Sequence, residues 1–167
     1  MSNRLLAALA VSAALILASC GGPSTPDFVR KAGGIDLYEI EAGKIAVEKG
    51  QSDAVKQFGQ QMVDAHTKTS EELKAIVTAE KLDVKLRDRL GRRHQKFIGA
   101  LNEAKPEAFD RIYADQQVRA HTKAVELYDA YAEGGDNGAL KQFAANTLPA
   151  VKEQRRAARK LAKTLAE

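Results

Sequence analysis

The chain has 167 residues, with 26 Lys and Arg against 22 Asp and Glu, which gives a formal net charge of +4. Charged residues make up 29% and hydrophobic residues 44% of it, which excludes an intrinsically disordered chain. Aromatic residues are 5%, Trp is absent and Pro occurs four times, so the composition favours helices over a β-sandwich or barrel. The single Cys excludes an intramolecular disulfide framework and a multi-cysteine zinc site.

The N-terminus has the pattern of a bacterial lipoprotein signal. Arg4 precedes an apolar stretch at 5–18, which is shorter than the roughly 20 residues of a membrane span but fits a secretory signal. The end of this stretch, Leu17-Ala18-Ser19-Cys20, resembles a lipobox, where a peptidase cuts before a Cys that receives lipid chains. We therefore expect a signal peptide at 1–19 and lipidation of Cys20. The alternative is an ordinary signal peptide or an uncleaved anchor with a chance Cys.

Residues 20–26 are expected to form the lipidated end and a short linker, followed by one domain at 27–167. Six flexible residues reach only about 13 Å, so the domain should lie close to the membrane surface. No Asp follows Cys20, which is the residue typical of inner-membrane retention in enterobacteria. We expect the protein to be exported and lipid-anchored in the cell envelope, at the outer membrane and facing the periplasm.

Apolar residues at helical spacing predict two long helices in the first half of the domain. The first spans 27–49, with Asp27 as its N-cap and Gly50 as its end. The second spans about 52–80. The stretch at 82–104 is less regular and predicts a loop followed by a short helix.

The second half predicts two further long helices. One begins at Pro106, where Pro is well tolerated, and ends at a Gly-rich turn over 134–138. The other spans about 139–166 and contains Pro149, which should kink or split it. The expected fold is all-α: an antiparallel four-helix bundle, ferritin-like, with a short extra helix between the second and third long helices.

Four polar residues lie on or near the apolar stripes, each close to the middle of its helix: Glu39, His66, His121 and Gln154. Helix midpoints share one level in an antiparallel bundle, so the four could meet in one polar layer, where buried polar groups need partners. One interpretation is a site for a single transition-metal ion. Another is a hydrogen-bonded layer that fixes helix register without any cofactor. A third is a small-ligand or proton-linked role.

The pattern of a ferritin-like di-iron site is incomplete in this sequence. Such sites need a Glu-x-x-His motif on two of the four helices. Val63 stands three residues before His66, and Val151 three residues before Gln154, so neither motif is present. Gln154 is also a poor ligand for transition metals, which leaves Glu39, His66 and His121 as the candidate ligands of a mononuclear site.

Several motifs follow one another in a specific order and spacing: 28–29, Glu39, 43–46, 55–66, 109–113, His121, 140–144 and 148–149. They resemble a family of bacterial envelope domains of unknown function with a ferritin-like four-helix fold, over about residues 28–165. The resemblance implies a helical bundle facing the periplasm and no established reaction. It also implies a His after the Leu-Pro of the fourth helix, where this chain has Gln154.

Basic residues of the last predicted helix lie away from its apolar stripe: Lys152, Arg155, Arg156, Arg159, Lys160 and Lys163. With the arginines at 87–93 they form either an ordinary solvated face or a surface near the membrane that attracts anionic lipid, lipopolysaccharide or cell-wall polymer. Nucleic acid is not expected as a partner of an exported protein. His94, next to two arginines, is expected at the surface.

The sequence contains no Gly-rich phosphate loop, nucleophile elbow or Cys–His nucleophile pair, so we expect no enzymatic activity. The favoured hypothesis is a non-enzymatic envelope lipoprotein with a binding or stress and envelope-maintenance role. The alternative is a metal-binding or redox ferritin-like protein that uses the mid-bundle Glu/His site.

Overall fold

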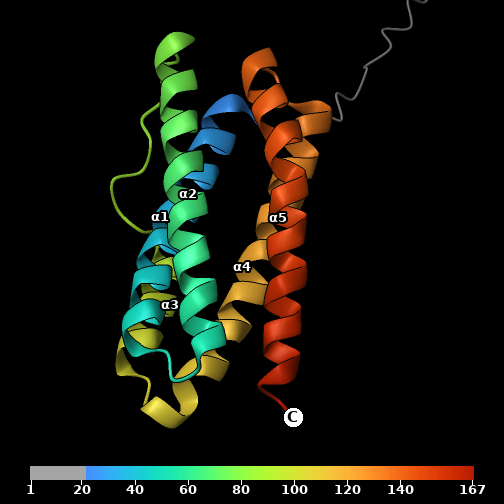
Figure 1. Cartoon of the computed structure of the whole chain (residues 1–167). Coiled ribbons are helices and arrows are strands. Elements are labelled where there is room, and N and C mark those ends of the chain that lie inside the picture. Colours follow the sequence, from blue (N-terminus) through green and yellow to red (C-terminus); the bar gives the residue numbers. More distant parts are fainter. Residues whose placement is uncertain (1–21) are drawn as a thin grey trace, which may run out of the picture.

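The computed structural model describes residues 22–167, and these residues form five helices and no strand (Figure 1). The helices are α1 (Thr25–Lys49), α2 (Asp53–Ala79), α3 (Arg92–Glu103), α4 (Pro106–Gly134) and α5 (Gly138–Thr164). The predicted all-α class is confirmed for this part of the chain. The predicted signal peptide at 1–19 and Cys20 lie outside the described residues. Among residues 22–167, no helix combines the length and apolar character needed to cross a membrane.

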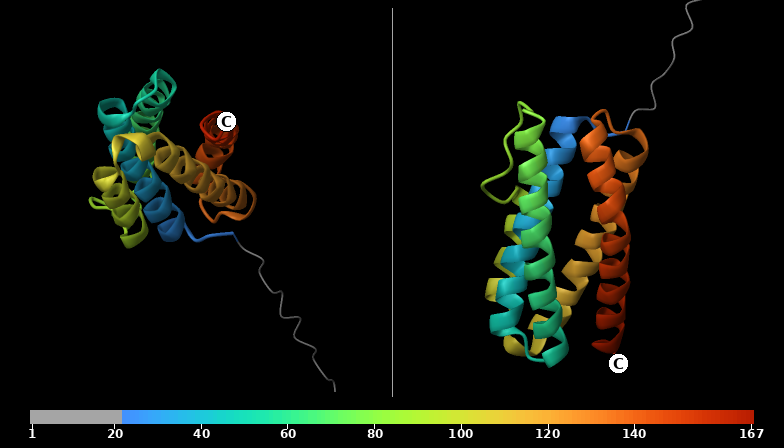
Figure 2. Two further views of the ribbon diagram at one scale, coloured as in Figure 1. Left: turned by 90° about the horizontal axis from the view of Figure 1, so that it is seen from below. Right: turned by 45° about the horizontal axis from the view of Figure 1, so that its top comes forward.

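The four long helices pack mainly as two pairs. α1 lies along α2, and α4 lies along α5, each pair joined by a short connection (Figure 1). The pairs meet through α1 and α4, whereas α2 and α5 make fewer contacts and stand apart in the end-on view of Figure 2. α3 packs on α1 and α4 and follows a long loop that descends from the end of α2.

The first helix begins at Thr25, two residues before the predicted start. Ser24 occupies the N-cap position and Asp27 lies in the first turn, where a negative charge interacts favourably with the helix dipole. The end of the predicted linker therefore belongs to α1. Gly22 is also held in place, because its backbone N–H donates to the carbonyl of Gly134 at 3.0 Å. The chain thus enters the domain beside the C-terminal end of α4.

The last helix is continuous through Pro149, so the expected split does not occur. Proline removes the backbone N–H that would bond to the carbonyl of Ala145 one turn earlier. Both Pro149 and Ala145 lie on the exposed side of α5, where water can satisfy that carbonyl. The helix begins with a side-chain cap, since the Asn137 side chain accepts from the N–H of Leu140 at 2.9 Å.

The apolar core is divided into two clusters, one near each end of the long helices. The cluster nearer Gly22 includes Phe28 and Tyr131, whose rings stack with centroids 4.0 Å apart. The other includes Phe58 and Phe109 and lies towards the C-terminal end of α5. Along each long helix, buried polar residues or Gln154 separate the two clusters. A polar layer therefore crosses the middle of the core.

Two glycines allow α1 and α2 to approach closely. A Cβ atom on Gly43 would lie 2.6 Å from the carbonyl oxygen of Gly59, and one on Gly59 would lie 2.8 Å from the carbonyl oxygen of Gly43. Both distances are too short for any side chain at these positions without separating the helix backbones. The pair fixes the spacing at which residues of α1 and α2 can meet.

We expect Gly59→Ala to lower the free energy of unfolding by about 1–3 kcal/mol, because the added methyl group overpacks the α1–α2 contact. Gly99→Ala is the matched control: Gly99 lies inside α3 with nothing within 4 Å of the added Cβ. There the change should raise stability by about 0.5–1 kcal/mol through helix propensity. Urea unfolding followed by circular dichroism measures both, and equal effects would contradict the close-contact argument.

Candidate functional site

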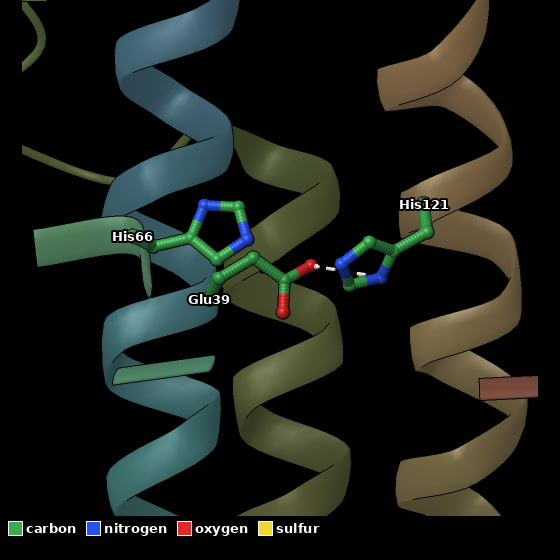
Figure 3. Close-up of side chains that lie close together, drawn as sticks. All are labelled: Glu39, His66 and His121. Carbon is green, nitrogen blue, oxygen red and sulfur yellow. Dashed lines mark ion pairs between the residues drawn. The ribbon is translucent and has the colours of Figure 1, made fainter. Parts of the chain in front are cut away.

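Three of the predicted polar residues meet in the layer between the two apolar clusters. Glu39 from α1, His66 from α2 and His121 from α4 each offer one ligand atom, and these atoms all lie within 4.8 Å of one another. Their exposed fractions are 0%, 3% and 1%. In Figure 3 the Glu39 carboxylate lies between the two imidazole rings. The arrangement is a buried cluster of two imidazoles and one carboxylate.

Hydrogen bonds fix the orientation of both imidazoles. Nδ1 of His66 lies 2.8 Å from Oδ1 of Asp36, and Nδ1 of His121 lies 3.0 Å from the carbonyl oxygen of Gln117. Both acceptors require a proton on Nδ1, so in the neutral imidazole the lone pair is on Nε2. The second nitrogen of each ring is thus available to accept a hydrogen bond or to ligate a metal.

The central atoms of the cluster have no hydrogen-bond partner among residues 22–167. They are Nε2 of His66, Nε2 of His121 and both carboxylate oxygens of Glu39. His121 Nδ1 and Glu39 Oε1 are 3.8 Å apart, which is an ion-pair distance but not a hydrogen bond. Buried polar atoms are normally satisfied, because an unsatisfied one costs about 1–3 kcal/mol. These atoms therefore need partners from outside residues 22–167.

The environment shifts the pKa values of His66 and His121 in opposite directions. Burial by itself lowers the pKa of His66, but its hydrogen bond to Asp36 and the charges of Glu39 and Asp36 outweigh burial and leave the pKa raised. Burial lowers the pKa of His121, and the Glu39 charge only partly opposes it. His121 is therefore the neutral imidazole, while His66 is the one that readily accepts a second proton.

Asp36 is a site residue that sequence reasoning missed. It is fully buried, and its Oδ1 accepts hydrogen bonds from His66 and, at 2.9 Å, from the hydroxyl of Thr69. A signal existed in the sequence, because Asp36 and Glu39 are three residues apart and so share one face of α1. Its partner lies on α2, however, and only the packing of the two helices reveals that contact.

The remaining polar residues of the layer surround the cluster without joining it directly. Gln154 is partly buried, and its Oε1 makes no hydrogen bond within the described chain, although the nearby amide acts to raise the pKa of His121. Gln116 bonds elsewhere: its Oε1 accepts from the hydroxyl of Tyr38 at 3.1 Å, and its amide donates to the carbonyl of Phe97 at 3.0 Å. Gln154 is thus the one α5 side chain placed to complete the cluster.

A cavity of about 810 Å³ between α2 and α5 opens beside the cluster, and His66 is the cluster residue that lines it. His66 and Gln154 line its inner part, and the exposed side chains of Lys68 and Glu72 lie at its rim. The cavity follows from the packing, since α2 and α5 make fewer contacts than the other neighbouring long helices. It brings the surface close to the His66 ring, although Nε2 itself is covered by neighbouring atoms.

The basic residues of α5 lie away from the point where the chain enters the domain. Gly22 bonds to Gly134 at the end of α4, just before α5 begins at Gly138, whereas the set 152–163 occupies the half of α5 nearer the C-terminus. At 1.5 Å per residue, Lys152 is already about 21 Å along the helix from Gly138. Lys152 is also paired, with Asp129 at 3.2 Å. Contact of this face with an anionic partner stays a prediction.

His94 is less exposed than expected. Its ring stacks on that of Tyr38, with centroids 4.6 Å apart, and its Nδ1 lies 3.1 Å from the carbonyl oxygen of Gly34. Burial lowers its pKa, and the charges of Arg93 and Arg87 act in the same direction. The third histidine of the chain is therefore a neutral residue that joins α3 to α1, outside the Glu39 cluster.

Comparison with known proteins now identifies the fold family. Residues 11–161 match the family described as Domain of unknown function (DUF4142). The chain belongs to the DUF4142 family. A solved structure with a similar fold is the "DUF305 fragment from Deinococcus radiodurans", with a TM-score of 0.68 and 12% identity over 85% of this chain and 99% of that chain. At 12% identity, this similarity shows that the DUF4142 protein shares a helical fold with that structure and nothing more. No curated protein matches the chain.

Substitutions of Asp36 and Glu39 test which residues of the buried cluster stabilise the fold of this DUF4142 protein. In chelator-treated protein, Asp36→Asn should lower the free energy of unfolding by about 1.5–3 kcal/mol, because it weakens a charged hydrogen bond to His66. Glu39→Gln should lower it by less than about 0.5 kcal/mol or even raise it, since no hydrogen bond of Glu39 is lost. Urea unfolding measures both variants. An equal loss in both would make Glu39 a structural residue.

Proposed function

We propose that this protein binds one transition-metal ion in the core of an antiparallel, ferritin-like four-helix bundle, and that lipidated Cys20 anchors the bundle in the cell envelope. The observation that carries the metal proposal is the convergence of Glu39, His66 and His121, with unpartnered atoms directed to a common centre. Export and outer-membrane anchoring rest on the sequence pattern at 1–20.

The donor set fits a transition-metal ion. Nitrogen and oxygen ligands lie about 2.0–2.2 Å from such an ion, so three of them spread evenly around it are about 3.8 Å apart. The ligand atoms of the cluster lie within 4.8 Å of one another, so the side chains would have to move together by up to about 1 Å to hold an ion. Two imidazoles and one carboxylate are the ligand set of non-haem iron(II) sites, and imidazole also suits zinc, copper and nickel.

The groups behind the ligands support the same proposal. In metal sites the second nitrogen of a ligating His commonly donates to a carboxylate or a backbone carbonyl, which fixes the ring and raises its basicity. Asp36 plays this part for His66, and the carbonyl of Gln117 plays it for His121. The site therefore has two ligands already oriented before any ion binds.

A mononuclear binding role agrees better with the residues than di-iron chemistry. In the Glu-x-x-His motif of di-iron sites a Glu stands three residues before the His, but this chain has Val63 at that position before His66. On α5 the side chain in the layer is Gln154, whose amide is a weaker metal ligand than an imidazole. We propose that the protein holds or transfers its ion without enzymatic turnover. The cavity between α2 and α5 is the access route in this proposal.

Metal content tests the proposal. The full chain, purified in a neutral detergent, is incubated with iron(II), manganese(II), zinc or copper(II), desalted and analysed by mass spectrometry for metals. We expect about one ion per chain, and at least about tenfold less in His66→Ala or His121→Ala, because each removes a ligand. His94→Ala is the matched control, since it removes the histidine outside the cluster, and it should retain the ion. Equal loss in all three variants would overturn the assignment of the site.

A gain of affinity provides an independent test. Gln154→His places an imidazole on α5, at the position beside His121, and should increase the time for which the ion is retained against a chelator by about tenfold or more. Cobalt(II) absorption spectra would report the added nitrogen ligand directly. An unchanged spectrum and retention time would show that α5 does not face the ion.

A further inference from the structure

A second cavity, of about 610 Å³, is lined by residues of α1, α4 and the segment at 87–94, none of which lines the α2–α5 cavity. Its thirteen lining residues include one acidic residue, Glu126, and six basic residues. The basic residues are Arg30, Lys31, Arg87, Arg92, Arg93 and Lys123. A hollow lined by charges of one sign concentrates the electrostatic potential and attracts counter-ions.

Most of these cations have no carboxylate partner. Arg30 pairs with Asp27, and Lys123 pairs with Glu126 at 2.6 Å. The other four, Lys31, Arg87, Arg92 and Arg93, form no ion pair within residues 22–167. Four uncompensated cations around one hollow repel one another, and a bound anion would relieve that repulsion.

The N-terminus of α3 opens at the same place. Gly91 is its N-cap residue, no side chain of the described chain caps the helix, and its first turn carries Arg92 and Arg93 in place of acidic residues. Cations are unfavourable at the positive end of a helix dipole, whereas an anion there gains both the dipole and the free backbone N–H groups. Together with the cavity and its unpaired cations, this makes the hollow suited to a phosphate group.

The packing of the loop against α1 holds the basic side chains in place. A Cβ atom on Gly34 would lie 3.0 Å from Cδ of Arg87, so the glycine lets that side chain lie flat on α1. Nε of Arg87 then donates to the carbonyl of Arg30 at 3.2 Å. The guanidinium is therefore positioned by the fold and does not simply extend into solvent.

The position of the cavity indicates where its ligand comes from. Pro23 lines the cavity and is three residues from Cys20, a separation of at most about 11 Å along the chain. We propose that this cavity binds the phosphate of an anionic phospholipid headgroup in the membrane to which the protein is anchored. The inference rests on the proposed lipidation of Cys20 for its membrane source, but not for the chemistry of the hollow.

The size and floor of the cavity favour a lipid headgroup over a free phosphate ion. A volume of about 610 Å³ falls in the range of pockets that hold drug-sized ligands. Ile35 and Leu127 contribute buried apolar surface beneath the basic rim. An amphiphile that carries a phosphate matches both features, whereas inorganic phosphate would use only the rim.

The test uses the full chain in dodecylmaltoside micelles, with the ring signals of His94 in proton NMR as the reporter, because His94 lines the cavity. His94→Ala assigns these signals among the three histidines. Adding phosphatidylglycerol should change the chemical shifts of the His94 ring protons, and this change should saturate as more lipid is added. Lys31→Gln/Arg92→Gln should weaken the apparent affinity about 30-fold, since each removes one cation near the bound charge.

Arg159→Gln/Lys160→Gln is the matched control, because it removes two exposed cations of α5 that form no ion pair within residues 22–167. It should change the apparent affinity less than about threefold. Equal weakening by both double variants would reduce the effect to general charge attraction and overturn the inference. A saturable shift of the His94 signals with phosphatidylcholine would also overturn the inference. The same shift with inorganic phosphate at the same concentration would overturn the assignment of the ligand to a lipid.

A Cys20→Ser variant separates this inference from the proposed anchor. In micelles it should bind phosphatidylglycerol as the unchanged chain does, because the binding residues lie in α1, α3, α4 and the loop. Mass spectrometry of the mature protein tests acylation of Cys20 independently. Absence of acylation would contradict the proposed anchor. His94 signals that do not shift with phosphatidylglycerol, in either the unchanged chain or the Cys20→Ser variant, would contradict the headgroup site.

Discussion

The placement of one carboxylate, Glu39, in the buried core is the constraint on which the rest of the structure depends. A buried charge is costly unless it is paired or coordinates a metal, and both oxygens of Glu39 lack a hydrogen bond within the described chain. His66 and His121 come to it from α2 and α4, and the polar layer that results divides the apolar core in two. Each of the two clusters contains its own large buried side chains.

The way the helices pair determines which parts of this layer are accessible. Gly43 and Gly59 draw α1 and α2 together, so that Asp36 reaches His66, and this tight pairing has no counterpart between α2 and α5. The resulting cavity opens next to His66. The basic cavity shares no lining residue with it and includes Pro23 near the N-terminal end of the described chain, so the two proposals place an ion and a membrane headgroup at different openings of the domain.

Much of the fold could be predicted because helices produce a regular spacing of apolar residues along the sequence. The spacing of apolar residues predicted the four long helices to within about two residues and a short helix within 82–104, and the polar interruptions of those stripes predicted Glu39, His66 and His121. Pro149 misled the prediction, since its effect depends on whether the carbonyl it leaves free faces water. Asp36 was missed because its partner is thirty residues away, on another helix.

The sequence by itself determined the helical class, the family and the polar positions near each helix midpoint, because periodicity and motif order are properties of neighbouring residues. Only the tertiary structure decided which polar atoms meet, which stay without partners and which cations surround a hollow. The six basic residues of α5 and those around the second cavity look alike in sequence, yet they lie in different halves of the molecule. Helix pairing and the course of a loop decide that difference, since they bring together residues that are far apart along the chain.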